Sequence, residues 1–129
     1  MKIFLSSEST LKDINREFQA QFPYLKLEFY RHNHNMGETS SFENKIPSRV
    51  QLKNISDNVP GFMHIDPMDT VAEVEQRFQT KFQLPVQIFR RAGNIWVETV
   101  ETDNLTLLKQ NSMGVIAPRI YFNTNTLFL

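Results

Sequence analysis

Three histidines are the residues of this 129-residue chain that could most readily bind a metal ion. His32 and His34 share the spacing His-x-His, and a site built on them would also need His64 and a carboxylate such as Glu28 or Glu38. Because His32 and His34 lie in an asparagine-rich stretch, we interpret them as solvated loop residues. We therefore expect no bound metal and no other cofactor.

Other arrangements typical of catalysis are missing from the sequence. The chain contains no cysteine, which excludes disulfides, thiolate zinc sites and cysteine nucleophiles. Its four glycines are scattered, so no glycine-rich phosphate loop exists. The carboxylates stand among lysines and arginines, which is typical of a solvated surface rather than of an acid–base pair. These observations favour a non-enzymatic role.

One cluster of side chains predicts a binding surface. Strand periodicity places aromatic and basic residues on the same face of neighbouring strands: Tyr30, Phe89, Arg91 and Trp96, with Lys26 beside them. Such a face can stack nucleic-acid bases, and it can equally form the hot spot of a protein interface. A formal net charge of +0 provides no surplus of phosphate-binding cations, so we expect a protein partner or a homo-oligomer.

Three functions remain open at this point. The first is a small non-enzymatic protein-interaction module, and the second is a weak single-stranded nucleic-acid binder that uses the same face. The third is a small enzyme or ligand-binding domain with a pocket under the polar loop 32–48. Alternation also allows two orientations of the last strand, because either Ile95 and Val97 or Trp96 and Glu98 can join the face. The tail 115–129 could also cover it.

An internal repeat supplies the elements that must position these residues. Residues 10–22 and 70–82 match at an offset of 60, with apolar residues at spacings of three and four: Leu11, Ile14, Phe18 and Phe22 in one copy, Val71, Val74, Phe78 and Phe82 in the other. This spacing predicts two amphipathic helices. Ser9 and Asp69 are the expected N-caps, because a short side-chain oxygen can bond an unpaired N–H of the first turn.

Short strands are expected before and after each helix, at 2–5, 25–30, 62–65 and 86–89. A turn at Gly93-Asn94 predicts a hairpin that adds the strand 94–99. A short third helix is expected at 104–111, with Asp103 as its N-cap. Residues 50–55 fit either an edge strand or an irregular excursion.

Together these elements predict one α+β domain over residues 1–114. Two strand–helix–strand units, 1–31 and 62–91, most simply form a ferredoxin-like two-layer sandwich, with the hairpin strand 94–99 and the short helix 104–111 added. The tail 115–129 is apolar enough that we expect it to dock on its own domain or on a neighbour.

The chain also resembles a family of small uncharacterised bacterial proteins over about residues 3–114. The resemblance rests on stretches such as Phe22–Phe29, Val86–Thr99 and Leu107–Asn111. It implies a bacterial, cytoplasmic setting and carries over no catalytic residue. The short apolar run near the start is also expected to be a strand rather than an export signal, and no apolar run is long enough for a membrane span.

Overall fold

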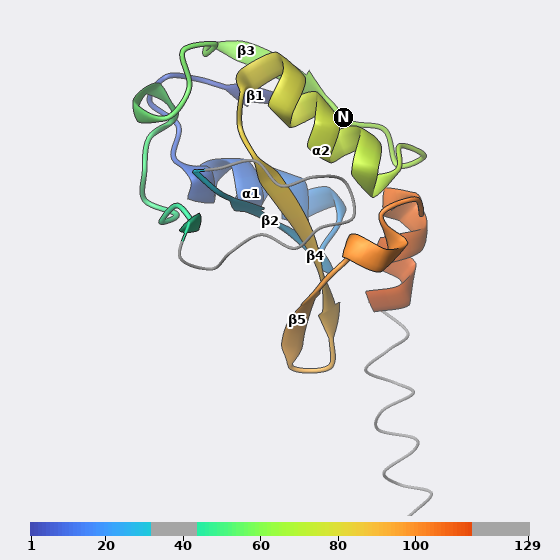
Figure 1. The fold of residues 1–129 in the computed structure, drawn as a ribbon. Helices are drawn as coiled ribbons and strands as arrows, with labels where there is room; N and C mark the ends of the chain where they lie inside the picture. Colours follow the sequence, from blue (N-terminus) through green and yellow to red (C-terminus); the bar gives the residue numbers. More distant parts are fainter. Residues whose placement is uncertain (32–43, 115–129) are drawn as a thin grey trace, which may run out of the picture.

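The computed structural model describes residues 1–31 and 44–114. The elements follow one another in the order β1 (Lys2–Leu5), α1 (Leu11–Gln21), β2 (Leu25–Phe29), η2 (Leu52–Asn54), β3 (Gly61–His64), α2 (Val71–Phe82), β4 (Val86–Ala92), β5 (Ile95–Glu98) and η3 (Val100–Thr102). A third helix begins at 107 and is described to 114 (Figure 1). The chain is therefore α+β, as predicted, and the predicted helices and strands are present with small shifts at their ends.

The two helices bury the apolar stripe that the periodicity predicts, since its members are at most 3% exposed. Their N-caps are Thr10 and Thr70, whose hydroxyls accept the backbone N–H of the third helical residue. The prediction of Ser9 and Asp69 as caps was therefore wrong by one residue. Ser9 instead bonds the Ser6 hydroxyl, and Asp69 bonds Arg77.

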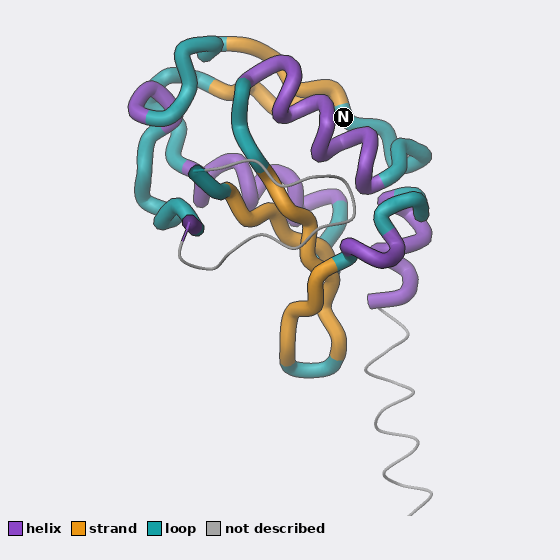
Figure 2. The backbone as a smooth tube through the Cα atoms, viewed as in Figure 1, coloured by secondary structure: helices purple, strands orange, loops and turns teal. Residues whose placement is uncertain are grey.

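The strands form two sheets rather than one. The strand segments fall into two separate groups (Figure 2). β1 pairs with β3, and β4 lies between β2 and β5; every pairing is antiparallel. The ferredoxin-like sandwich is not confirmed, because it would place the four strands of the two units in a single sheet. In this chain each strand instead pairs with the equivalent strand of the other unit. The β4–β5 hairpin extends from the end of the molecule opposite β1 and β3 (Figure 1).

Burial explains why β2 pairs with β4. One face of each strand is apolar and packs on the helices: Leu25, Leu27 and Phe29 from β2, Val86 and Ile88 from β4. The register sets Leu27 opposite Ile88, which joins the two stripes into one continuous surface. At its centre the Phe29 and Phe78 rings meet edge to face, with their centroids 5.7 Å apart.

The two units make matching polar contacts. In the structure, the first unit comprises the described residues up to 54 and the second comprises residues 61–114. In the first unit the Asn15 side chain on α1 accepts the N–H of Leu27 at 2.9 Å. In the second unit the Glu75 side chain on α2 accepts the N–H of Ile88 at 2.9 Å. In each unit the helix thus accepts an N–H that points away from the β2–β4 pairing, by the same kind of bond.

The two units also correspond in the short segments that form a bridge with the start of each helix. One of these segments, residues 50–55, allows two interpretations from the sequence alone. Gln51 forms a bridge with Thr10, and the turn η2 follows, so residues 50–55 are neither a full strand nor an irregular excursion. Thr106 forms the equivalent bridge with Thr70, and the third helix follows. The Thr106 hydroxyl accepts the N–H of Lys109, so the expected cap at Asp103 was placed too early.

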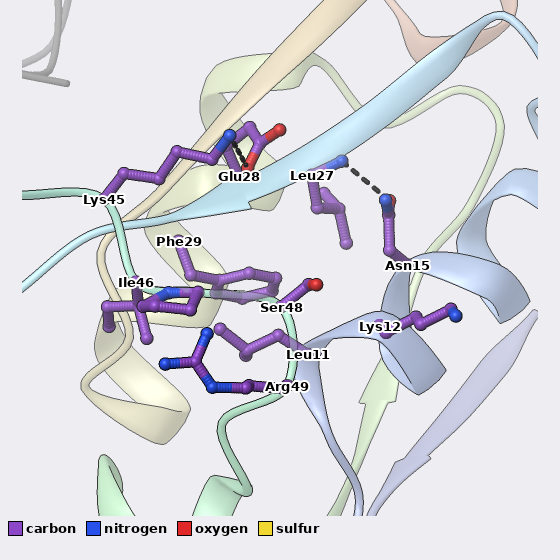
Figure 3. A pocket seen from close by; sticks show the side chains of 11 residues that line it. Leu11, Lys12, Asn15, Leu27, Glu28, Phe29, Lys45, Ile46, Ser48 and Arg49 are labelled. Carbon is purple, nitrogen blue, oxygen red and sulfur yellow. Dashed lines mark hydrogen bonds and ion pairs between the residues drawn. The ribbon is translucent and has the colours of Figure 1, made fainter.

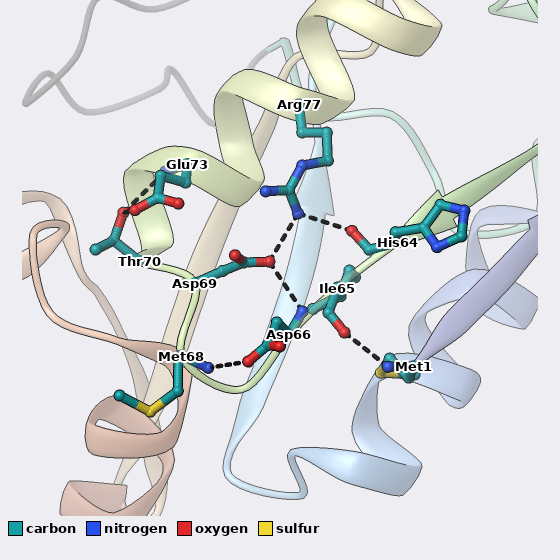
Figure 4. A network of polar contacts seen from close by, with 9 residues as sticks. All are labelled: Met1, His64, Ile65, Asp66, Met68, Asp69, Thr70, Glu73 and Arg77. Carbon is teal, nitrogen blue, oxygen red and sulfur yellow. Dashed lines mark hydrogen bonds and ion pairs between the residues drawn. The ribbon is translucent and has the colours of Figure 1, made fainter.

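Side chains of α2 also close the outer edge of β3 (Figure 4). Arg77 donates to the His64 carbonyl and to the Asp69 carboxylate, both at 2.7 Å, and Lys81 donates to the Phe62 carbonyl. Blocking edge carbonyls in this way removes acceptors that an added strand would use. Within the described ranges, no helix combines the length and apolar character required to cross a bilayer.

Candidate functional site

The predicted binding residues other than Tyr30 gather on one face of the β2–β4–β5 sheet. Phe89 lies opposite Lys26 on β2 and Glu98 on β5, and Arg91 lies opposite Trp96. The register therefore selects the orientation in which Trp96 and Glu98, rather than Ile95 and Val97, share this face. We call Lys26, Phe89, Arg91 and Trp96 the aromatic–basic face.

Lys26 lies at the centre of the aromatic–basic face. Its Nζ atom is 5.1 Å from the centroid of the Trp96 ring and 5.5 Å from that of Phe89. The Arg91 guanidinium carbon lies 5.9 Å from the Trp96 centroid. Both cations are within the range in which a ring quadrupole attracts positive charge, so they hold the Trp96 indole in place.

Carboxylates balance much of the charge on this face. Glu28 pairs with Lys26 at 2.9 Å and with Lys45 at 3.2 Å, and its side chain is largely shielded from solvent. Glu98 adds a second carboxylate beside Phe89. Arg91, which is exposed, donates to the carbonyl of Gly93 in the hairpin turn and keeps its positive charge at the rim. Within the described chain the surface is mixed in charge rather than basic.

Tyr30 is not available on the open part of the face. The structure buries it to 3% exposure, one residue beyond the end of β2, where its backbone pairs with Lys45. Burial is the main reason that the pKa of its phenol is raised, and the nearby carboxylates of Glu28, Glu98 and Glu75 raise it further. Strand alternation places Tyr30 on the side of the aromatic–basic face, but it does not predict what packs over the ring.

The edge of the sheet beside the aromatic–basic face is β5. Among the described residues β5 pairs only with β4, and Ile95 at its start is 61% exposed. Gly93 in the turn adopts a φ of 63°, a backbone conformation that glycine reaches without strain. The hairpin thus presents an exposed aliphatic side chain, an indole and an arginine within a few residues.

A pocket of about 620 Å³ lies between α1 and β2, on the side of residues 45–49 (Figure 3). A pocket under loop 32–48 is what we predict for a small enzyme or ligand-binding domain, the third of the three functions. This pocket lies at that position, because residues 45–48 are the end of the loop. The described end of that loop is more ordered than expected: Ile46 is buried and donates its N–H to Phe29. Residues 32–43 lie outside the described ranges.

The predicted metal ligands are not brought together in the part of the chain that the structure describes. His64 is exposed on β3, opposite Lys2, while His32 and His34 fall outside the described residues. No group of three or more histidine and carboxylate side chains within 1–31 and 44–114 is arranged to hold a metal ion. The tail 115–129 likewise lies outside the described residues.

Comparison with known proteins yields no match: no family model, no curated protein and no solved structure matches this chain. The resemblance to a family of small bacterial proteins therefore stays a prediction. The function has to be argued from the surface and the pocket themselves.

Proposed function

We propose that this chain is a non-enzymatic protein-interaction module that binds an extended segment of a partner protein along β5 and the aromatic–basic face. The observation that carries the proposal is Trp96, a partly exposed indole held between Lys26 and Arg91 on β5, which has one strand partner among the described residues. Tryptophan and arginine are the residues most enriched at the energetic centres of protein interfaces.

The edge of β5 supplies the second half of the interaction. A strand whose outer edge has no neighbour can accept an extended peptide through backbone hydrogen bonds, while side-chain pockets give specificity. The exposed Arg91 favours a carboxylate in the partner segment, and Ile95 favours an aliphatic residue on the opposite side. Trp96 and Phe89 then become the buried centre of the interface, with Arg91 at its rim.

The charges of the face disfavour the alternative of single-stranded nucleic acid. The Glu28 carboxylate pairs with both Lys26 and Lys45, and Glu98 adds a second negative charge to the same surface. Phosphate binding depends on uncompensated cations and weakens steeply with added salt. A second copy of this chain is the other alternative occupant, and light scattering of the free protein distinguishes it from a different partner.

The test compares Trp96→Ala with Phe62→Ala, a matched loss of an exposed ring on β3. Partners captured by the wild-type chain are identified, purified and titrated against all three proteins. We expect Trp96→Ala to weaken binding at least tenfold, about 1.4 kcal/mol, while Phe62→Ala binds like wild type. Equal affinities for wild type and Trp96→Ala contradict the proposal, and a steep loss of binding with salt indicates nucleic acid.

A further inference from the structure

The pocket between α1 and β2 exists because the two units differ in one segment, the turn η3 of the second unit. In the second unit the Thr99 hydroxyl donates to the Ile88 carbonyl at 2.7 Å. The turn η3 follows, and only then does the Asp103 carbonyl accept the N–H of Ala72 at the start of α2. Residues 99–103 therefore occupy the space between helix and strand in that unit.

Residues 44–54, which follow β2 in the described first unit, have no such turn at the equivalent position. Ile46 pairs with Phe29 as Val97 pairs with Arg90, so Ser48 stands at the register position of Thr99. The Ser48 carbonyl already accepts the N–H of Lys12 at 2.9 Å. The chain thus passes directly from the edge of β2 to the start of α1, and the space that η3 fills in the second unit is left open as the 620 Å³ pocket.

Opening this space leaves polar groups of the pocket without partners. The N–H of Leu27 points away from β4 to Asn15, and its carbonyl points to the same outer edge because strand pairing alternates. The equivalent Ile88 carbonyl is satisfied by Thr99. Within the described residues neither the Leu27 carbonyl, nor the Ser48 hydroxyl, nor the Asn15 side-chain amide N–H has a hydrogen-bond partner.

The rim of the pocket is positively charged. Lys12 and Arg49 line it, are both exposed, and have no ion-pair partner within the described residues. Glu28, the one acidic side chain of the described lining, pairs with Lys45 (Figure 3). It also pairs with Lys26, which lies outside the lining. The first N–H groups of α1 bond the carbonyls of Ser48 and Val50, so the attraction for an anion comes from the two side chains.

We propose that this pocket binds a small organic carboxylate with an apolar body. Lys12 and Arg49 attract the carboxylate, and the buried side chains of Leu11, Phe29 and Ile46 receive the apolar part. A donor on the ligand can reach the Leu27 carbonyl. The volume lies within the range of about 300–1,000 Å³ that is usual for small-molecule sites. The pocket adjoins the aromatic–basic face through Glu28, which lines the pocket and pairs with Lys26, but the proposal does not depend on the function of that face.

The test uses two probes with the same naphthalene body and opposite charge, 2-naphthoate and 2-naphthylmethylammonium. Each is titrated into the full-length ¹⁵N-labelled protein while backbone amide shifts are recorded. We expect naphthoate to shift the amides of Asn15, Leu27, Ser48 and Arg49 in a saturable way, and the ammonium probe to leave them unchanged. Equal shifts from both probes, shifts confined to another surface, or no saturable shift up to millimolar naphthoate overturn the proposal.

A double variant, Lys12→Gln with Arg49→Gln, tests whether binding depends on the two positive charges or on the shape of the pocket alone. We expect at least tenfold weaker binding of naphthoate to it, with an unchanged amide spectrum elsewhere. The matched control, Arg16→Gln with Lys53→Gln, removes two exposed cations that do not line the pocket and is expected to bind like wild type. Undiminished binding to the first double variant refutes the assigned role of Lys12 and Arg49.

Discussion

At the scale of single residues, the contacts of Asp69 contribute to the stability of the folded chain. The Arg77 guanidinium and the N–H of Asp66 both bond its carboxylate, and these contacts lower the pKa of Asp69 below its usual value (Figure 4). A carboxyl group with a lowered pKa stabilises the folded chain above the pKa of the unfolded chain, about 4. That stabilisation is lost as the pH falls through the lowered pKa.

We therefore predict that Asp69→Ala lowers the free energy of unfolding at pH 7 by about 1–3 kcal/mol, the cost of losing hydrogen bonds to a charged group. The difference in unfolding free energy between wild type and Asp69→Ala is expected to shrink as the pH is lowered below about 4. Asp69 then becomes protonated in the folded wild type, as it already is in the unfolded chain. Urea unfolding at several pH values measures both effects. Asp57→Ala, at an exposed position, is the control, and a difference that is independent of pH would refute this account.

At the scale of elements, the start of each helix depends on one hydroxyl. Thr10 caps α1 together with Asp13, whose side chain bonds the Thr10 N–H in return, and Thr70 caps α2. We predict that Thr10→Ala and Thr70→Ala each lower the free energy of unfolding by about 0.5–2 kcal/mol. Urea denaturation followed by circular dichroism measures the change.

Thr80→Ala is the control for the two caps. Thr80 lies inside α2, where its hydroxyl accepts from the Gln76 side chain, and alanine has the higher helix propensity. We expect its stability to equal or exceed that of the wild type. A loss at Thr80 as large as that at Thr10 and Thr70 would show that the capping bonds are not the cause.

At the scale of the whole molecule, the two units share both sheets. β1 pairs with β3 and β2 with β4, so each of these two pairings takes one strand from each unit. Buried residues of both units also belong to a single apolar cluster. Neither unit can bury its own strand edges and apolar stripe alone, so we expect one cooperative unfolding transition.

Ile14→Val tests this cooperativity. Ile14 is fully buried on α1 in the first unit, whereas Trp96, the one tryptophan of the chain, reports on the second. We predict a loss of about 0.5–1.5 kcal/mol that appears equally in Trp96 fluorescence and in far-ultraviolet circular dichroism during urea unfolding. The exposed substitution Glu17→Gln is expected to leave both curves in place. A fluorescence transition that Ile14→Val does not move would mean that the units unfold separately.

Local patterns predicted well those features that depend on neighbours in sequence. The stripe of apolar residues on α1 and α2, the hairpin turn at Gly93 and the inward side of β2 all follow from periods of 3.6 and 2 and from the φ range of glycine. The caps were misplaced because Ser9 and Thr10 are both good capping residues. Ser9 bonds Ser6, whereas the Thr10 hydroxyl accepts the N–H of Asp13 and the Asp13 carboxylate accepts the N–H of Thr10, and these contacts decide between them.

The sequence by itself determined the α+β class, the two equivalent helices and the side of the sheet on which Phe89, Arg91 and Lys26 lie, because these depend on backbone periodicity alone. The tertiary structure decided which strands pair, that Trp96 rather than Ile95 shares the face, and that Tyr30 is buried. It also opened the pocket beside Ser48, where the described part of the first unit lacks the η3 turn of the second. The pairing of β1 with β3 and of β2 with β4, and the burial of Tyr30, depend on contacts between residues far apart in the chain, which periodicity does not encode. The position of Trp96 depends on the register of the β4–β5 hairpin, which alternation alone leaves open.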